Sequence, residues 1–207
     1  MSCGVNFTLA VGENGGLWAW GNDINRNLDR GPTVPDDTLL QLQIHTPERV
    51  FKNRTQGVAL RGVVAVSAVY RHSACVTETG ELWMWGDGHW GQIGQGAPQS
   101  QNNSKCIPRA QHGGVGVAMV SCADMHTLVL TADGRAWSCG SGEYGKLGHS
   151  NPPEEQPILD FLKFVETAAL VAGDASTLQT APRYAMIAAG HRHSVRWTGT
   201  GACGAGG

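Results

Sequence analysis

Short runs of alternating apolar and polar residues recur along the chain, and they favour strands over helices. Residues 73–77 alternate in this way and carry β-prone side chains, so we expect a strand there. Residues 81–85 form the returning strand, with Trp83 and Trp85 two positions apart and therefore on one face. Gly80 lies in the turn between them, because glycine readily adopts the positive φ that tight hairpin turns require. The pattern predicts a β-hairpin.

The same hairpin occurs four times. Eight positions separate a histidine from the turn glycine, as in His72 and Gly80, and the same spacing links Phe7 to Gly15 in the first copy. The distance from one copy to the next varies, which indicates that insertions lie in loops between repeated supersecondary units. The repeated hairpins lie near residues 2–21, 67–86, 121–140 and 188–207.

A glycine cluster and further β-prone residues follow the hairpins, including those at 47–51 and 63–66. A two-stranded hairpin buries too little surface to be stable alone. Additional strands would complete a four-stranded blade, and blades stacked radially cover one another's apolar faces. We therefore expect an all-β fold, in which residues 1–207 form β-propeller blades of four antiparallel strands.

Two insertions interrupt the regular pattern. The stretch near 28–45 is polar and contains Pro32 and Pro35, so we expect a loop. The stretch near 150–172 is also a predicted loop, although the apolar spacing within 157–171 fits a short helix.

The motifs of the second copy are distinctive. Ala68 to Ser73 reads A-x-x-x-H-S, the next strand reads G-E-L-W-M-W-G, and residues 86–94 end in G-x-x-G-Q-I-G. In this combination the chain resembles the repeat of the regulator of chromosome condensation family. The resemblance implies a propeller, usually of seven blades. Four copies, the last of which lacks a Leu-Trp-x-Trp-Gly segment after Gly201, give only three to four blades. We expect an incomplete propeller, a fragment of a larger protein.

Composition and charge narrow the function further. The net charge is −2, with 15 basic and 17 acidic residues and no basic block, so binding of nucleic acid through this chain is not expected. No apolar run approaches the length of a membrane span, and the N-terminus does not resemble a signal peptide. The six cysteines form no C-x-x-C pair, and we interpret them as reduced thiols of an intracellular protein, cytoplasmic or nuclear.

No residues with the pattern of a catalytic, cofactor or metal site are evident, so we do not expect an enzyme. The histidines at positions 72, 126 and 193 recur once per repeat, and we expect buried imidazoles that bond the backbone of their own blade. Cys122 and His126, placed on one strand, would lie about 13 Å apart, too far for one zinc ion. The glycine-rich residues 86–94 lack the Lys-Ser/Thr of a phosphate-binding loop.

Binding therefore falls to the loops, which vary while blades stay constant. Aromatic, Arg, His and Met side chains gather before the repeated histidine and after the hairpin, and Tyr, Trp, Arg and Met are enriched in protein interfaces. The opposing interpretation is that Trp90 and Tyr144 pack between blades. The candidate protein-binding residues are Tyr70, Arg71, His89, Trp90, Met125, Tyr144 and Arg192.

These observations favour a protein–protein interaction module in a larger scaffold, ubiquitin-pathway or signalling protein. The family resemblance implies one alternative, guanine-nucleotide exchange on a Ran-like small GTPase, although no acidic hairpin can be assigned as the wedge. It also implies a weaker alternative, an ultraviolet photoreceptor, because plant sensors use this propeller with clustered Trp and Arg. Trp83, Trp85 and Trp90 lie close in sequence, but no G-W-R-H-T motif occurs.

Overall fold

The computed structural model describes residues 1–30, 43–148, 164–166, 183–199 and 203–206. Within them, regular structure consists of strands and two short 3₁₀ helices, η2 (Arg109–His112) and η3 (Glu143–Gly145). The strands are β1 (Ser2–Cys3), β2 (Phe7–Val11), β3 (Leu17–Asn22), β4 (Gln43–Arg49), β5 (Phe51–Asn53), β6 (Val58–Ala59), β7 (Val63–Ala68), β8 (His72–Thr77), β9 (Leu82–Gly86), β10 (Gln101–Ile107), β11 (Val117–Cys122), β12 (His126–Thr131), β13 (Ala136–Gly140), β14 (Val165–Glu166), β15 (Met186–Ala189), β16 (Ser194–Trp197) and β17 (Cys203–Gly206).

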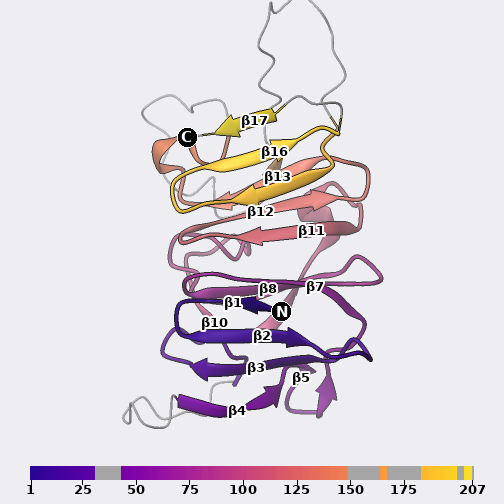
Figure 1. The fold of residues 1–207 in the computed structure, drawn as a ribbon, viewed down its shortest axis with the longest axis vertical. Coiled ribbons are helices and arrows are strands. Elements are labelled where there is room, and N and C mark those ends of the chain that lie inside the picture. Colours follow the sequence, from indigo (N-terminus) through magenta and orange to yellow (C-terminus); the bar gives the residue numbers. More distant parts are fainter. Residues whose placement is uncertain (31–42, 149–163, 167–182, 200–202, 207) are drawn as a thin grey trace, which may run out of the picture.

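The strands form four antiparallel sheets that follow one another along the molecule (Figure 1). We call β1–β4 the first blade, β7–β10 the second, β11–β14 the third and β15–β17 the fourth. A separate hairpin, β5 and β6, lies between the first and second blades in sequence. In Figure 1 the first and fourth blades lie at opposite ends of the stack, so the described sheets form an incomplete propeller.

Each blade is organised around the predicted hairpin. In the second blade, His72 pairs with Gly86 and Ser73 with Trp85 across β8 and β9. The first and third blades repeat this register, with Phe7 and His126 opposite Gly21 and Gly140. Alternation along these strands sends successive side chains to opposite faces of the sheet, so one hairpin serves two blade interfaces.

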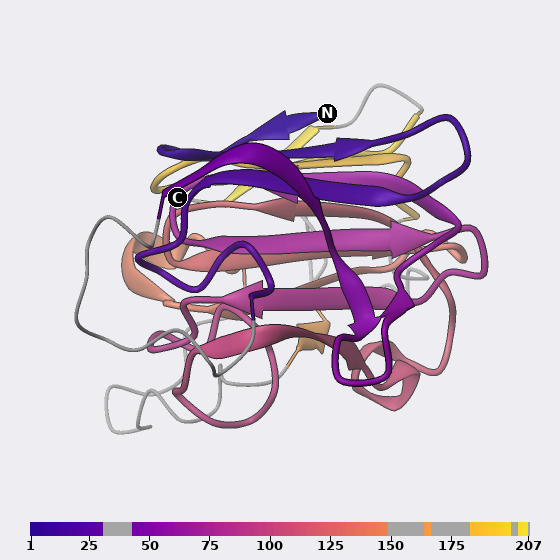
Figure 2. The same cartoon turned by 90° about the horizontal axis from the view of Figure 1, so that it is seen from below.

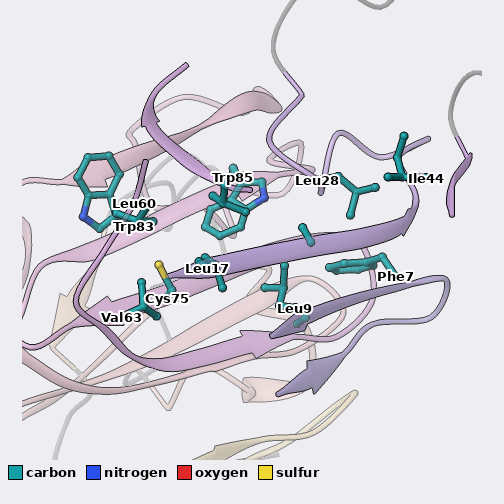
Figure 3. Close-up of a cluster of buried hydrophobic side chains, with 13 residues drawn as sticks. Phe7, Leu9, Leu17, Leu28, Ile44, Leu60, Val63, Cys75, Trp83 and Trp85 are labelled. Carbon is teal, nitrogen blue, oxygen red and sulfur yellow. The ribbon is translucent and has the colours of Figure 1, made fainter. Parts of the chain in front are cut away.

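Three apolar cores separate the four blades. Trp83, Trp85 and Cys75 of the second blade pack toward the first blade, in the cluster drawn in Figure 3. Leu82 and Met84, which alternate with those tryptophans, belong to the core shared with the third blade. A smaller core between the third and fourth blades contains Leu128, Leu130, Ala136 and Ile187. The predicted placement of Trp83 and Trp85 on one face of their strand is confirmed.

Backbone hydrogen bonds join neighbouring blades at the hairpin turns. The N–H groups of Val63 and Val117, which begin the first strand of a blade, donate to the carbonyls of Gly15 and Gly80 at 3.0 Å. Tyr184 N–H donates in the same way to the carbonyl of Gly134 at 2.7 Å. The repeated turn therefore both reverses the chain and fixes the next blade.

The connections differ in detail from the sequence expectations. Strand β4 begins at Gln43, inside the predicted loop near 28–45, whereas residues 31–42 lie outside the described residues. The strand expected at 47–51 is divided between β4 and β5. Most of the possible helix at 157–171 lies outside the described residues, and its described strand, β14, pairs with β13.

Candidate functional site

In each of the first three blades, two described loops lie at the same end of the strands. Because neighbouring strands are antiparallel, the connection before the second strand and the connection after the third meet at one edge of the sheet. Figure 2 shows the strands of successive sheets crossing the view, with connections gathered at their two ends. We call the end opposite the hairpin turns the loop face; it comprises residues 4–6, 22–26, 69–71, 87–90, 123–125, 141–145 and 190–192.

One group of candidate side chains lies around Asp87 on this face. The Arg71 guanidinium is 4.9 Å from the centroid of the Tyr70 ring and 3.9 Å from Asp87 Oδ2. His89 Nδ1 lies 2.6 Å from Asp87 Oδ1. Partial burial raises the pKa of Asp87, but the hydrogen bonds and charges of His89 and Arg71 outweigh it and lower that pKa below its usual value. Asp87 is therefore an anion that positions two cationic or polar side chains.

Two adjoining hollows open beside this group. The larger, of about 560 Å³, is lined by Arg71, Asp87 and His89 of the second blade and by the first-blade loop at 24–26. The smaller, of about 300 Å³, includes Tyr70 and shares Ile24, Asn25 and Arg71 with its neighbour. The site therefore spans the boundary between two blades.

Ser100, His89 and Asp87 also meet at the larger hollow, but their geometry is not that of a catalytic triad. Asp87 Oδ1 and Ser100 Oγ approach the same ring atom, His89 Nδ1, at 2.6 and 3.3 Å. A triad needs the carboxylate on one ring nitrogen and the nucleophile on the other, so that the imidazole can take the hydroxyl proton. This cluster instead fixes the orientation of the histidine.

A second group lies on the loops of the third and fourth blades. The Arg192 guanidinium is 5.1 Å from the centroid of the Tyr144 ring, and Tyr144 is 61% exposed. His191 Nδ1 lies 3.4 Å from Asp124 Oδ2. Tyr70, Arg71 and His89 thus come together, as do Tyr144 and Arg192.

Trp90 and Met125 lie on the loop face outside these two groups of contacts. Trp90 is 39% exposed, and its backbone N–H donates to Gln92 Oε1 at 2.9 Å. Met125 is half-buried, immediately before the buried His126.

Sequence reasoning did not select the residues that the first blade adds to the hollows, Ile24, Asn25 and Arg26. An alignment of the repeats would have found the first two, because the position after each hairpin places Ile24 with His89 and Asn25 with Trp90. Arg26 stands where the later repeats have glycine, and it holds a left-handed φ of 61°. Its exposed side chain adds a cation that a glycine could not supply.

The buried histidines have a different partner from the one expected. His72 Nε2 lies 2.8 Å from Thr127 Oγ1, and His126 Nε2 lies 3.0 Å from Ser194 Oγ, each on the next blade. The expectation that they bond the backbone of their own blade is wrong. The two hydroxyls donate their protons to the carbonyls of Gln92 and Lys146, at 2.7 and 2.6 Å.

Since each hydroxyl proton is already used, the imidazole must be the donor, with its proton on Nε2. Burial lowers the pKa of His72 to about 4 and that of His126 to about 3, so both rings are neutral near pH 7. Cys122 ends β11 and His126 begins β12, so their expected placement on one strand is also wrong.

Other kinds of site were sought throughout the described ranges. These residues contain no group of three or more His, Cys, Asp or Glu side chains arranged to hold a metal ion. The five cysteine side chains that the structure describes are free thiols. No helix in the described part of the chain is long and apolar enough to cross a membrane.

Family models and related proteins both identify the repeat. A family described as "Regulator of chromosome condensation (RCC1) repeat" matches residues 79–130, and a second of the same description matches 63–92 and 120–146. The chain is 35% identical over 152 residues to human E3 ubiquitin-protein ligase HERC2, and the matched region covers 72% of this chain and 3% of the ligase. It is 31% identical over 153 residues to the ultraviolet-B receptor UVR8 of Arabidopsis thaliana, covering 73% of this chain and 31% of the receptor.

The chain thus spans only a minor part of these relatives. The similarity to the ligase concerns its repeat region, and it does not extend the ligase reaction to this chain.

Solved structures agree with the fold. Human WBSCR16 matches with a TM-score of 0.75 at 20% identity, over 98% of this chain and 45% of that one. Yeast RCC1, solved bound to Kap60, matches with a TM-score of 0.70 at 22% identity, over 98% of this chain and 42% of that one. With the repeat motifs, the blade topology and the sequence relatives in agreement, the chain belongs to the RCC1 repeat family, as an incomplete β-propeller.

Proposed function

We propose that this chain is a protein-interaction module that binds its partner through the loop face, as part of a larger scaffold or signalling protein. The observation that carries the proposal is the gathering of exposed aromatic and arginine side chains at loops of several blades. Tyr70 is 38% exposed, Trp90 39% and Tyr144 61%. Such side chains bury large areas on binding at a small cost in conformational entropy.

The arrangement favours a protein surface over a small molecule as the partner. The hollows at Arg71 are lined by loops of two blades, and the group at Tyr144 and Arg192 belongs to the other two blades. A partner that contacts both groups therefore touches loops of all four blades. Arg71 and Arg192 already stack on aromatic rings, which restricts their rotamers before binding.

Two single substitutions on the loop face test the proposal. We expect Arg71→Glu and Tyr144→Ala each to reduce recovery of specific partners from cell extract at least tenfold, measured by quantitative mass spectrometry of proteins retained on the immobilised chain. Arg61→Glu is the matched control, because Arg61 is exposed beside Gly62 at the hairpin-turn end. Equal loss in the control, or retention of every partner by both loop-face variants, would refute a loop-face site.

Guanine-nucleotide exchange on a small GTPase is the second candidate. A related structure, Prp20p from Saccharomyces cerevisiae, is described with binding properties to Gsp1p and histones, and it matches this chain with a TM-score of 0.66 at 24% identity. Exchange predicts faster release of a fluorescent guanine nucleotide from a purified Ran-type GTPase. The interaction-module proposal predicts an unchanged release rate at high micromolar concentrations of this chain.

We also propose that the protein lies in a reducing compartment inside the cell and that it is not itself an enzyme. Cys75, Cys122 and Cys139 are fully buried as free thiols, and burial raises the pKa of Cys122 to about 12. These thiols pack as small apolar side chains between blades, and none of the three forms a disulfide.

A further inference from the structure

The larger hollow on the loop face exposes cationic and polar side chains and buries its carboxylate. The charged or titratable residues that line it are Arg26, Arg71, Asp87 and His89. Asp87 is only 8% exposed, whereas the side chain of Arg71 is 49% exposed and that of His89 is 71% exposed. Arg26 is exposed as well. A ligand that enters the hollow therefore meets the two arginines and the imidazole before it meets the carboxylate.

Neither arginine of the hollow donates a hydrogen bond from its guanidinium to a described residue. Arg71 lies 3.9 Å from Asp87 Oδ2, which is longer than the about 2.8 Å of a charge-assisted hydrogen bond. Its guanidinium stacks instead on the ring of Tyr70, at 4.9 Å from the centroid. Because a guanidinium presents five N–H donors in a planar fork, both arginines have donors that a ligand can use.

The backbone at Arg26 is a second observation that points to a ligand. Arg26 has a φ of 61°, a conformation that glycine adopts readily and other residues adopt only at a cost. The second and third repeats have Gly91 and Gly145 at this position, with φ of 77° and 67°. Among the described residues, no ion pair or hydrogen bond of the Arg26 side chain offsets that cost. The arginine thus contributes to the hollow and not to the fold.

Hydrogen bonds hold both sides of the hollow in place. On the first blade, Arg26 N–H donates to the Asp23 carbonyl at 2.8 Å, and Leu28 N–H donates to Asp23 Oδ1 at 2.8 Å. On the second blade, His89 N–H donates to Asp87 Oδ1 at 3.1 Å. The loops that carry the exposed groups are therefore ordered before a ligand binds, which lowers the entropic cost of binding.

The charges in the larger hollow match one carboxylate. Two guanidiniums and the Asp87 carboxylate leave one excess positive charge when His89 is counted as neutral. A guanidinium binds a carboxylate through parallel N–H donors, a geometry that its planar fork favours. A nucleic acid would need a longer track of cations along its phosphates, and Asp87 would repel it. The hollow is therefore suited to the side chain of one acidic residue.

The smaller hollow continues the site with groups that suit a peptide main chain. It is lined by the amide side chains of Asn6, Asn22 and Asn25, and by Tyr70. Each amide carries a donor and an acceptor, as does each peptide unit of an extended chain. Asn25 and Arg71 line both hollows, so a segment that follows the smaller hollow reaches the arginines of the larger one.

We propose that the two hollows bind a segment of a partner protein and that Arg26 and Arg71 hold an Asp or Glu side chain of that segment. The inference rests on the proposed function, in which the loop face binds a protein. Arg71, oriented by its stacking on Tyr70, contacts the carboxylate from the second blade, and Arg26 contacts it from the first. Both blades that line the site belong to this chain.

Peptide selection on the immobilised 207-residue chain tests the proposal. The probes are random phage-displayed peptides of about ten residues, which span roughly 33 Å when extended. Enriched peptides are synthesised with a fluorescent label, and their affinities are measured by fluorescence anisotropy. We expect the enriched peptides to share an Asp or Glu. Replacing that residue by Asn or Gln should weaken binding at least tenfold, because the charge-assisted hydrogen bonds are lost.

Substitutions in the chain locate the binding site. Arg26→Gly and Arg71→Gln should each weaken binding of the acidic peptides at least tenfold. Glycine suits the φ of Arg26, so urea unfolding of the first variant should show no loss of stability. Arg61→Gln is the matched control, because Arg61 is an exposed arginine at the hairpin-turn end, and it should bind as the unaltered chain does.

A charge exchange makes the test more specific. Arg71→Glu should lose the acidic peptide but bind a peptide whose acidic residue is replaced by Lys, because the two charges are then interchanged. This rescue requires direct contact between the two side chains, and a general loss of fold could not produce it.

The outcomes separate this inference from the proposed function. If extract partners depend on Arg71 and Tyr144 but Asn or Gln peptides bind as well as the acidic ones, the carboxylate assignment fails and the interaction module stands. If neither partners nor peptides depend on these residues, both fail. A selection that yields no peptide dependent on Arg26 and Arg71 also overturns the inference. So does single-stranded DNA that binds more tightly than the peptides and is weakened by Arg26→Gly.

Discussion

At the scale of single residues, the buried histidine is the part of the repeat with the clearest energetic consequence. His72 donates one hydrogen bond across a blade boundary, and its Nδ1 has no hydrogen-bond partner in the described structure. Protonation would place a charge among apolar side chains, and so burial lowers the pKa to about 4. In the first blade Phe7 fills the same position, which indicates that ring volume matters there as well as hydrogen bonding.

The variant His72→Phe is expected to reduce the sensitivity of the protein to acid. The folded-state pKa of about 4 lies below the ordinary value of 6.5, so the unfolded chain binds the proton more tightly. The histidine's contribution is fully present above about pH 6.5 and falls by about 1.4 kcal/mol per pH unit as the pH drops toward 4. At neutral pH the variant should lose only about 1 kcal/mol, for one hydrogen bond.

Urea unfolding of both proteins at several pH values between 4 and 7 measures this difference. The comparison with the unaltered chain is essential, because Asp23 and Asp29 change the stability with pH in the direction opposite to the histidines. Burial raises the pKa of each to about 6, and so their stabilising contribution is lost as the pH rises from about 4 to 6. Parallel pH profiles for the variant and the unaltered chain would contradict the assignment of His72.

At the scale of elements, the hairpin turn carries two constraints at once. Gly80 has a φ of 74°, and a Cβ added there would lie 2.8 Å from the Cα of Gly116, where the third blade begins. Gly57, in the turn between β5 and β6, has a φ of 68° but no atom within 4 Å of an added Cβ. The two glycines separate the cost of backbone conformation from the cost of blade contact.

We expect Gly80→Ala to lower the free energy of unfolding by about 3 kcal/mol and Gly57→Ala by only about 1 kcal/mol. The smaller cost is that of a left-handed alanine, and the excess is the displacement of one blade from the next. Urea denaturation of the two variants measures both values. Equal losses would show that blade contact at Gly80 adds nothing.

The loop of the first blade shows how one repeat compensates for a missing glycine. Asp29 holds a left-handed φ of 61° where later repeats have Gly94 and Gly148. Its carboxylate accepts hydrogen bonds from the N–H groups of Phe51 and Ser104, at 2.7 and 2.5 Å. These bonds tie the loop of the first blade to β5 and to β10 of the second. Asp29 thus adopts a backbone conformation that favours glycine, and its side chain connects the two blades.

At the scale of the whole molecule, the open stack separates two kinds of surface. The loop face collects exposed aromatic and arginine side chains from several blades, and it is the surface that we propose for partner binding. The faces between neighbouring blades are apolar instead, and there the side chains of one sheet are buried against the next. The blade faces therefore hold the fold together, while the loops remain accessible to a partner.

The sequence by itself determined the hairpin at the centre of each blade and the two faces of its strands. The spacing from His72 to Gly80 and on to Gly86 recurs, alternation assigns each strand residue to one of two faces, and both depend on local geometry. The loop-face candidates could be named for the same reason, because their positions relative to the hairpin repeat.

Only the tertiary structure decided which blades supply each contact. It brought the loop at 24–26 beside Arg71 and His89, and it linked His72 to Thr127 and not to its own backbone. It also left His193 exposed where its repeat equivalents are buried. Repetition in the sequence determines which side chain each blade has at a given repeat position, but the burial of that side chain depends on whether another blade is stacked against it.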